Sequence, residues 1–354
     1  MADTDLGPYG GWPAILGTLT GGGSLSREVA RAAMAEILTG AATPAQIAGY
    51  VIALRMKGET VDELAGMVDA MLASSERVEI DTSGPVVDIV GTGGDRAHTI
   101  NVSTIAALVV AGAGGKVCKH GNRAASSACG TADVLEALGV AITLGPAGVA
   151  RCVAEAGIGF CFAPRYHPAM RHAGPPRREL GVPTAFNVLG PLSNPGRVTR
   201  YLIGVADARM AERMAGVLLA NGAVRALIVH GGDGLDELTT TGPSTIVELD
   251  DGEVSTWTVD PTELGLARAS SSDLAGGDAQ RNAALVRRVL AGDPGPHRDI
   301  VALNAGAGLV AAGLVDDIAA GISAACGSID SGAASAALDR MVEVSQRERA
   351  AEPT

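Results

Sequence analysis

A chain of 354 residues with a formal net charge of −12 lacks the basic excess that nucleic-acid-binding surfaces need. Only 3% of its residues are aromatic, which leaves few side chains on which bases could stack. The hydrophobic share of 47% and the charged share of 19% are those of a globular protein, and no apolar run is long enough to predict a membrane span. We therefore expect neither nucleic acid nor membrane as a partner.

The amino-terminal stretch MADTDLGPYGGWP carries early acids and no cationic segment, so it does not predict a secretory signal. Cysteine usage agrees with this expectation. The chain has no CxxC pair, and its cysteines show neither zinc-ligand spacing nor a disulfide framework. We expect reduced thiols in a cytoplasmic protein.

Residues 24–75 predict a small, purely helical module. Ser26 can cap a first helix, and Thr43-Pro44-Ala45-Gln46 combines an N-cap, a proline at the first helical position and a capping-box glutamine. A second capping box starts at Thr60, and apolar residues follow the i, i+3, i+4, i+7 rule behind both boxes. We assign a helical domain to residues 12–80.

The pattern changes near residue 85. Short apolar runs such as Val86–Val90 and Ala226–Val229 alternate with helical patterns, which predicts an α/β domain with a central sheet flanked by helices. We assign this large domain to residues 81–174 and 201–346. The Pro- and Arg-rich stretch near 175–200 is predicted to return to the small all-helical N-terminal domain.

A glycine-rich motif, GTGGD at residues 91–95, follows the first predicted strand. It has neither the Gly-Lys-Ser/Thr of an ATP-hydrolysing P-loop nor the GxGxxG spacing of a dinucleotide-binding turn. Its glycines allow backbone amides to face an anion, and Thr99, Asn101, Ser103 and Thr104 follow where a helix is predicted to begin. Taken alone, the motif is equally compatible with a tight strand–helix turn.

The segment KVCKHGNRAASSACGTAD, residues 116–133, brings Lys119, His120 and Arg123 together among small residues, beside Asn122. In an acidic chain, attraction of an anionic ligand must come from such a local group of charges. We interpret this segment as a basic loop that binds an anion. The alternative is a solvated surface turn.

Asp236 and Glu237 are adjacent carboxylates in the segment GGDGLDELTTT. Mg²⁺ is typically held by one or two carboxylates together with substrate phosphates and water. The two side chains could each serve a different ion, with the Ser103 hydroxyl as a further ligand. The alternative is a pair of exposed acids on a loop.

Residues 161–180 carry several arginines and histidines, among them His167 and Arg177. A guanidinium turned inward could bind an acceptor's carboxylate through two parallel hydrogen bonds, while the other arginines provide surface charge. No Ser-His-Asp or Cys-His arrangement can be assembled. The polar segments together predict an enzyme site for a phosphorylated substrate held through Mg²⁺.

These motifs, taken in order, resemble those of anthranilate phosphoribosyltransferases over residues 12 to 345. The matching segments are GTGGD, NVST, KHGNRAASS, the Gly-Thr-Ala-Asp after Cys129, FAPRYHPAMRH, FNVLGPLSNP and DGLDELT. The resemblance implies the fold type shared by nucleoside phosphorylases and these phosphoribosyltransferases. It also implies transfer of a phosphoribosyl group from 5-phosphoribosyl 1-diphosphate to the amine of anthranilate, in tryptophan biosynthesis, by a homodimer joined through the helical domain.

The resemblance further assigns residues to ligands. It implies two Mg²⁺ ions per monomer on Ser103, Asp236 and Glu237. Anthranilate is assigned to Gly91, Asn122, Arg177, His120 and His167. The donor is assigned to Gly91, Gly94, Asp95, Thr99, Asn101, Val102, Ser103, Thr104, Lys119, His120, Gly121, Asn122, Arg123, Ala124, Ala125, Ser126, Ser127 and Thr131.

The implied chemistry agrees with the residues present. Glycosyl transfer builds oxocarbenium-like charge on the ribose, and cations stabilise the departing diphosphate. Because the anthranilate amine is already a nucleophile, we expect positioning to matter more than an acid–base residue, and we assign none. The alternatives are a pyrimidine nucleoside phosphorylase-like pentosyltransferase, a non-catalytic phosphosugar-binding regulator and a structural interaction module.

Overall fold

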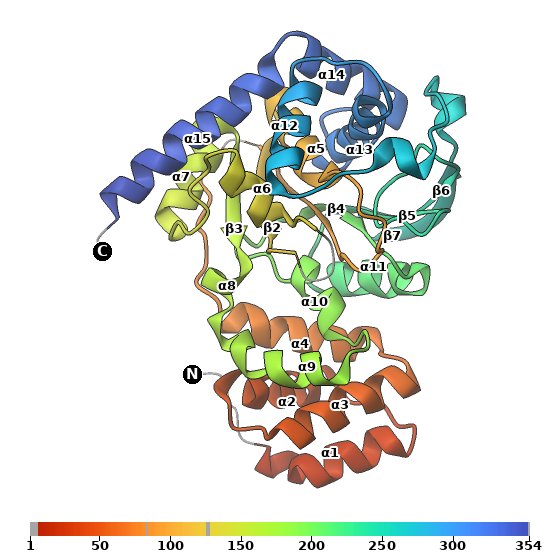
Figure 1. Ribbon diagram of the computed structural model, residues 1–354. Helices are drawn as coiled ribbons and strands as arrows, with labels where there is room; N and C mark the ends of the chain where they lie inside the picture. The colour runs from red at the N-terminus through yellow and green to blue at the C-terminus, as the bar shows by residue number, and fades with distance from the viewer. Residues whose placement is uncertain (1–5, 83, 125–127, 353–354) are drawn as a thin grey trace.

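The computed structural model describes residues 6–82, 84–124 and 128–352, and Figure 1 shows a helical bundle at one end of a larger α/β part. In the bundle, α2 packs along α4 and α1 packs along α3. The bundle helices are α1 (Gly11–Thr20), α2 (Arg27–Thr39), α3 (Pro44–Lys57) and α4 (Val61–Ala73).

Local sequence explains where these helices begin. Ser26 caps α2, and capping boxes at Thr43 and Thr60 start α3 and α4, as predicted. Helix α1 was missed because its glycine-rich surroundings obscure a short apolar face. That face is buried through Trp12, whose indole N–H donates to a Glu36 carboxylate oxygen at 2.7 Å.

A seven-stranded mixed sheet forms the centre of the α/β part, in the order β3-β2-β1-β4-β5-β6-β7. The first five strands in this order run parallel, whereas β6 and β7 form an antiparallel hairpin at one edge. The predicted fold class is confirmed. The strands are β1 (Val86–Gly91), β2 (Lys116–Gly121), β3 (Ile158–Phe162), β4 (Arg200–Gly204), β5 (Arg225–Gly231), β6 (Ser244–Asp250) and β7 (Glu253–Val259).

Helices cover both faces of this sheet. On one face α5 and α13 pack against the strands, and α14 and α15 pack behind them; α7 and α11 cover the other face. The remaining bounds are α5 (Val102–Gly112), α6 (Thr131–Ala137), α7 (Pro146–Ala156), α8 (Ala163–Tyr166), α9 (Gly174–Leu180), α10 (Phe186–Leu192), α11 (Ala211–Ala220), α12 (Ala279–Leu290), α13 (Pro296–Ala312), α14 (Ile318–Asp330) and α15 (Ala333–Ala351).

The bundle and the sheet share one continuous apolar core. In β4, Tyr201 and Ile203 join the core that extends into the bundle, whereas Leu202 faces the core under α5 and α13. This alternation is the period of two expected of a strand buried on both faces. The chain returns to the bundle through a 3-10 helix at Pro168–His172, which contacts α2, and through α9 and α10, which contact α3 and α4.

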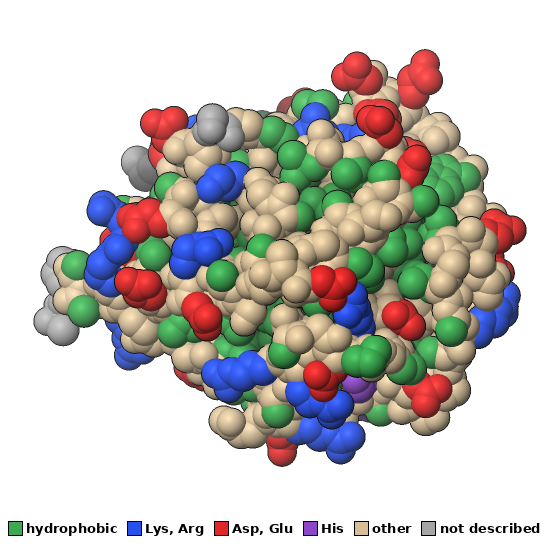
Figure 2. All heavy atoms as spheres, turned by 90° about the horizontal axis from the view of Figure 1, so that it is seen from above, with side chains coloured by type: hydrophobic (Ala, Val, Ile, Leu, Met, Phe, Trp, Pro, Cys, Tyr) green, Lys and Arg blue, Asp and Glu red, His purple; other side chains and the backbone are tan. Residues whose placement is uncertain are grey.

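Figure 2 shows basic side chains interspersed with acidic ones on the face seen from above in the orientation of Figure 1. Among the described residues, no helix is long and apolar enough to cross a membrane.

Gly204, the last residue of β4, has no room for a side chain. A Cβ atom built there would overlap the backbone carbonyl oxygen of Asp236. We expect Gly204→Ala to lower the free energy of unfolding by about 1–3 kcal/mol, the usual range for overpacking a core. Chemical denaturation of the purified variant measures this change.

Gly327→Ala is the matched control, because Gly327 lies on the exposed face of helix α14 with open space around its Cβ position. That variant should be stabilised by about 0.5–1 kcal/mol, since alanine favours helix over glycine. Equal stability of Gly204→Ala and the parent chain would contradict the close contact with Asp236.

Candidate active site

The carboxyl ends of the parallel strands lie together at one end of the sheet. The direction in which successive strands are added to the sheet changes at β1. From β1 the strand order runs to β2 and β3 on one side and to β4 and β5 on the other. Open α/β sheets bind ligands at such a switch point, outside the strand ends. A cavity of about 390 Å³ lies there, lined by residues that follow β1 and β2, by parts of α9 and α10, and by Asp236 and Glu237.

Asp236 and Glu237 are buried against the strand ends and do not lie on an exposed loop. A side chain at Gly91 would overlap the Asp236 carboxylate, so glycine is required where this segment crosses β1. One Asp236 oxygen accepts a hydrogen bond from the Gly93 amide at 2.6 Å, and one Glu237 oxygen accepts from the Ser103 amide at 3.1 Å. The two carboxylates therefore join the glycine-rich loop to the start of α5.

The electrostatics of this pair favour a cation beside it. Burial raises the pKa of both carboxyl groups, that of Glu237 to about 7, and the negative charges of Glu237 and Asp95 raise the pKa of Asp236 further. A bound cation would offset this unfavourable charge. Oxygen ligands of this kind suit Mg²⁺.

The described residues contain no set of three or more His, Cys, Asp and Glu side chains arranged to hold a metal ion. A metal bound by Asp236 and Glu237 would therefore take its remaining ligands from hydroxyl groups, water or substrate. Mg²⁺ is commonly bound in this way beside substrate phosphates.

Lys119 lies beneath the cavity, because it belongs to strand β2 and not to the predicted basic loop. The loop begins only after Gly121, so Lys119 and His120 were wrongly placed on it. The Lys119 ammonium donates to the Ile89 carbonyl and to the Ser103 hydroxyl. Burial lowers the pKa of Lys119, and the nearby Asp88 carboxylate opposes that shift.

A fully buried aspartate holds the base of the site in place. Asp88 in β1 accepts hydrogen bonds from the Asn194 side-chain amide at 2.7 Å and from the His120 backbone amide at 3.1 Å. Burial raises the pKa of Asp88 to about 6, although the Lys119 charge acts in the opposite direction. Asn194 also donates to the Cys118 carbonyl, so this network connects β1 to β2.

His120 and His167 form a buried pair with ring centroids 5.1 Å apart. Nδ1 of His120 bonds to the Gly190 carbonyl and Nε2 of His167 to the Ser193 carbonyl, each at 3.0 Å. Burial lowers the pKa of His120 to about 3 and that of His167 to about 4, so both rings are neutral near pH 7. The second nitrogen of each ring has no hydrogen-bond partner among the described residues.

The basic loop proper starts at Asn122 and is closed by Asp133. One Asp133 oxygen accepts from the Ala124 amide at 3.0 Å and from the Gly130 amide at 2.9 Å. Arg123 pairs with Asp133 and Glu136 at 2.8 and 2.9 Å, so acids already offset its charge. The expected cation of this loop is therefore partly neutralised.

Arg177 on α9 is the half-buried cation of the cavity. Its guanidinium lies 5.5 Å from the ring centroid of Phe186, and burial lowers its pKa. Within the described part of the chain it has no carboxylate partner. An unpaired guanidinium against an aromatic wall is suited to a planar carboxylate ligand.

The structure brings most of the predicted site residues to this one cavity. Thr104, Lys119 and His167 do not line it, and they lie behind residues that do. The predicted donor contacts of Ala125, Ser126 and Ser127 lie outside the described residues. The predicted residues that line the cavity are Gly91, Gly94, Asp95, Thr99, Asn101, Val102, Ser103, His120, Gly121, Asn122, Arg123, Ala124, Thr131, Arg177, Asp236 and Glu237.

Sequence reasoning missed three contributors. Phe186 and Asn187 line the cavity from α10, and they lie in the FNVLGPLSNP motif, which was noticed without a role for either residue. Asn282 on α12 donates to the Asn101 side chain at 2.8 Å, and Asn101 donates to the Cys129 carbonyl at 3.1 Å. No local signal marks Asn282, because its partner lies far away in the sequence.

Comparison with known proteins accounts for the whole arrangement. The sequence model of the protein family "Glycosyl transferase family, a/b domain" matches residues 83–335. The sequence model of the family "Glycosyl transferase family, helical bundle domain" matches residues 13–75. Anthranilate phosphoribosyltransferase from Arthrobacter sp. (strain FB24) is 55% identical over 341 residues, which cover 95% of this chain and 96% of the relative. The chain belongs to the anthranilate phosphoribosyltransferase family.

Solved structures of this family have the same fold. The Thermus thermophilus enzyme matches with a TM-score of 0.89 and 43% identity, covering 94% of this chain and 99% of its own. The Saccharomyces cerevisiae enzyme in complex with PRPP and Mg matches with a TM-score of 0.85 and 29% identity, covering 95% and 98%. Its complex with 4-fluoroanthranilate gives a TM-score of 0.84 at 27% identity, covering 95% and 99%.

Family membership confirms the activity expected from the sequence motifs. The chain is an anthranilate phosphoribosyltransferase, a transferase of tryptophan biosynthesis, and the alternatives of a nucleoside phosphorylase, a regulator or a structural module are set aside.

The Asp88 network predicts a pH-dependent stability. In the folded chain Asp88 is protonated below about pH 6, whereas in the unfolded chain it is protonated only below pH 3.8. The stabilisation that results from this difference in pKa is full below pH 3.8 and is lost as pH rises through about 6. Asp88→Asn removes this titration. From pH 7 to pH 5, the free energy of unfolding of the parent should rise by about 1 kcal/mol relative to the variant.

Urea unfolding of both proteins at the two pH values provides the measurement. A difference between parent and variant that does not change with pH would show that Asp88 keeps an ordinary pKa.

Proposed function

We propose that this cavity binds 5-phosphoribosyl 1-diphosphate (PRPP) and anthranilate side by side and transfers the phosphoribosyl group to the anthranilate amine, with Mg²⁺ on the Asp236–Glu237 pair. The half-buried Arg177 guanidinium, without a carboxylate partner among the described residues, carries the proposal. It lies in the same cavity as the glycine-rich loop and the carboxylate pair. One wall thus suits an aromatic carboxylate and the other a diphosphate.

The donor is assigned to the residues that follow β1 and β2. Gly93 and Gly94 have φ values of 70° and 89°, which turn successive amides outward in a way that glycine permits. The Gly93 amide is already held by Asp236, whereas the Gly94 amide has no partner in the described chain. The amino-terminal end of α5, an eleven-residue helix, lies at the same place and favours negative charge.

The metal assignment is Asp236 and Glu237, with the Ser103 hydroxyl as a third ligand, for two Mg²⁺ ions per protomer. Its support is the buried oxygen donor set, the raised pKa values of the two carboxyls, and the yeast relative in complex with PRPP and Mg. When bound, Mg²⁺ neutralises charge on a departing diphosphate.

Anthranilate is assigned to Arg177, Asn122 and Gly91, with His120 and His167 behind them. Arg177 would receive the carboxylate, and stacking on Phe186 fixes the plane of its guanidinium. Burial holds His120 and His167 neutral, so these rings add no charge to the acceptor region. The yeast relative in complex with 4-fluoroanthranilate supports an acceptor of this class.

The chain's own residues then act by positioning. Arg177 holds the carboxylate at one end of the acceptor, which leaves the amine directed at the ribose carbon that bears the diphosphate. Such alignment of two substrates contributes a large share of rate enhancement without a strong base. The glycine-rich amides hold the diphosphate as its bond to ribose breaks.

The homodimer expected from the family resemblance remains part of the proposal, with the helical bundle as the joining surface. Two exposed large apolar side chains, Tyr9 and Met56, belong to this bundle or its amino-terminal approach. Light scattering coupled to size-exclusion chromatography measures the assembly directly.

Removing the metal ligands should abolish turnover. In the double variant Asp236→Asn, Glu237→Gln, neutral amides replace the two charges that would hold Mg²⁺, while the shape of the segment is kept. We expect kcat to fall by at least roughly 100-fold, the scale of losing a preorganised electrostatic element. The assay follows the loss of anthranilate fluorescence in the presence of PRPP and Mg²⁺. A reaction with EDTA gives the rate without metal.

Circular dichroism of the double variant checks that the fold is kept. Turnover within a few-fold of the parent would refute the metal assignment.

Truncating Arg177 should weaken acceptor binding. Arg177→Ala removes a charge-assisted bidentate contact, so KM for anthranilate should rise by about 10- to 100-fold while KM for PRPP changes little. Arg178→Ala is the matched control, because Arg178 is the next residue of α9 and is more exposed. Unchanged anthranilate KM in Arg177→Ala, or the same rise in Arg178→Ala, would remove Arg177 from the site.

A further inference from the structure

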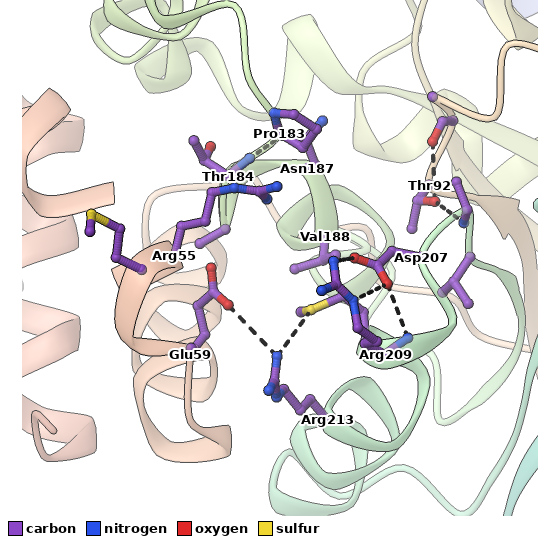
Figure 3. A pocket seen from close by; sticks show the side chains of 18 of the residues that line it. Arg55, Glu59, Thr92, Pro183, Thr184, Asn187, Val188, Asp207, Arg209 and Arg213 are labelled. Atoms are coloured by element: carbon purple, nitrogen blue, oxygen red, sulfur yellow. Dashed lines mark hydrogen bonds and ion pairs between the residues drawn. The ribbon is translucent and has the colours of Figure 1, made fainter. Parts of the chain in front are cut away.

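A second cavity, of about 470 Å³, lies between the bundle and the α/β part (Figure 3). Its walls are the end of α3 with the residues after it (55–59), the segment 183–188 at the start of α10, and residues 205–213 after β4. It shares Thr92, Gly93, Gly94 and Asn187 with the active-site cavity, so the two cavities meet at the glycine-rich loop.

The lining of this second cavity is rich in cations, although the chain as a whole is acidic. Arg55, Lys57, Arg209 and Arg213 line it, against the carboxylates of Glu59 and Asp207. Cations thus outnumber carboxylates by two, in a chain of net charge −12. Local charge of this sign attracts small anions.

Two of these cations are already paired. Lys57 donates to the buried Glu63 carboxylate at 2.9 Å, outside the cavity lining. Arg209 is held by two hydrogen bonds from its guanidinium to Asp207, at 2.9 and 2.7 Å. Neither is therefore fully available to a ligand.

The other two cations are available. Arg55 has no hydrogen bond or ion pair to any described residue, and Figure 3 shows it beside Thr184 at one wall of the cavity. Arg213 approaches Glu59 only at 3.9 Å and the Met210 sulfur at 3.6 Å. Most of the N–H donors on these two guanidiniums are thus free for an anion.

Two buried polar side chains in the lining also lack hydrogen-bond partners among the described residues. Glu59 is 8% exposed, and the 3.9 Å approach of Arg213 is its one ion pair there; in Figure 3 it points toward Arg213. Thr184 is 6% exposed, and its hydroxyl makes no hydrogen bond to the described chain. The unpartnered Thr184 hydroxyl can donate to an anion, whereas the Glu59 carboxylate only accepts hydrogen bonds and repels an anion.

The bundle and α11 are packed against each other outside the lining of the cavity. Helix α11 lies against α4, where a Cβ atom at Gly216 would come within 2.8 Å of the Val61 side chain. Farther along α11, Arg27 of the bundle donates to Asn221 at 2.6 Å. These contacts fix the bundle to α11.

We propose that this second cavity is an anion site for diphosphate, which receives the leaving group of the reaction as it departs from the glycine-rich loop. The proposal rests on the proposed function, because it takes diphosphate to be the product. Diphosphate offers oxygens to both free guanidiniums, and arginine binds phosphate oxygens through parallel hydrogen bonds. The unpartnered Gly94 amide lies between the two cavities, within the lining that they share.

Glu59 has a defined part in this arrangement. It lies beside Arg213 and provides the nearest carboxylate to that guanidinium. Its negative charge also weakens the attraction for diphosphate, which keeps the leaving group from being retained. Removing that charge should therefore tighten diphosphate binding.

The test is a calorimetric titration of sodium diphosphate into the full-length protein without Mg²⁺ and without PRPP, so that metal-dependent binding in the active site is absent. The parent should bind diphosphate, and the double variant Arg55→Ala, Arg213→Ala should bind it at least roughly tenfold more weakly. Arg340→Ala, which removes an exposed arginine from α15, should leave the affinity unchanged.

Glu59→Gln distinguishes charge from structural damage. It should bind diphosphate more tightly than the parent, whereas a distorted cavity would bind it more weakly. Ribose 5-phosphate is the second probe, because the 5-phosphate of the donor or product offers related chemistry. Tighter binding of ribose 5-phosphate than of diphosphate, or the same diphosphate affinity in the parent and the Arg55/Arg213 variant, would overturn the proposal.

Turnover gives an independent readout. In the parent, diphosphate should lower kcat as well as raise KM for PRPP, because it occupies a place that PRPP does not fill. In the Arg55/Arg213 variant only the competitive effect should remain. Absence of all turnover would refute the proposed function but leave the direct titration interpretable, so the two failures are distinguishable.

Discussion

The structure depends on one buried ammonium group placed among three carboxylates. Lys119 lies under the switch point of the sheet, with Asp88 on one side and Asp236 and Glu237 on the other. Burying any of these charges alone would be costly, and together they offset one another only in part, since the carboxyl pKa values stay raised. In our proposal, this excess of negative charge over a single cation is offset by Mg²⁺.

These four charged side chains also limit which residues can surround them. Gly91 and Gly204 end β1 and β4 without side chains, because the Asp236 segment crosses directly over both positions. Asp88 ties Asn194 to the backbone of β2, so the segment that returns from the bundle is anchored at the base of the cavity. The proposed acceptor side, with Arg177 and Phe186, is thereby positioned relative to the proposed donor side.

The bundle is part of this arrangement, since its apolar core continues into one face of the sheet. The second cavity lies between the bundle and the α/β part, and it shares the glycine-rich loop with the active-site cavity. One cavity holds the reacting ends of the substrates in our proposal. The other has the charge and the open donors suited to an anion that leaves.

The sequence by itself determined the features whose cause is local. Capping boxes at Thr43 and Thr60 specify helix starts through contacts three residues apart, and the apolar run before GTGGD specifies a buried strand followed by a turn. Motif order indicated the family, and the ligand roles of the carboxylate pair, the donor loops and Arg177 remain proposals drawn from it. These inferences need only neighbouring residues or recurring segments.

Tertiary structure alone decided what depends on distant contacts. It placed Lys119 and His120 on a strand beneath the cavity, because pairing with β1 and β3 overrides the polar appearance of that segment. It neutralised Arg123 with Asp133 and Glu136, joined Asn282 to Asn101, and brought Arg55 and Arg213 to the walls of one cavity. Burial and charge pairing arise only when remote segments meet in space, so no local pattern in the sequence encodes them.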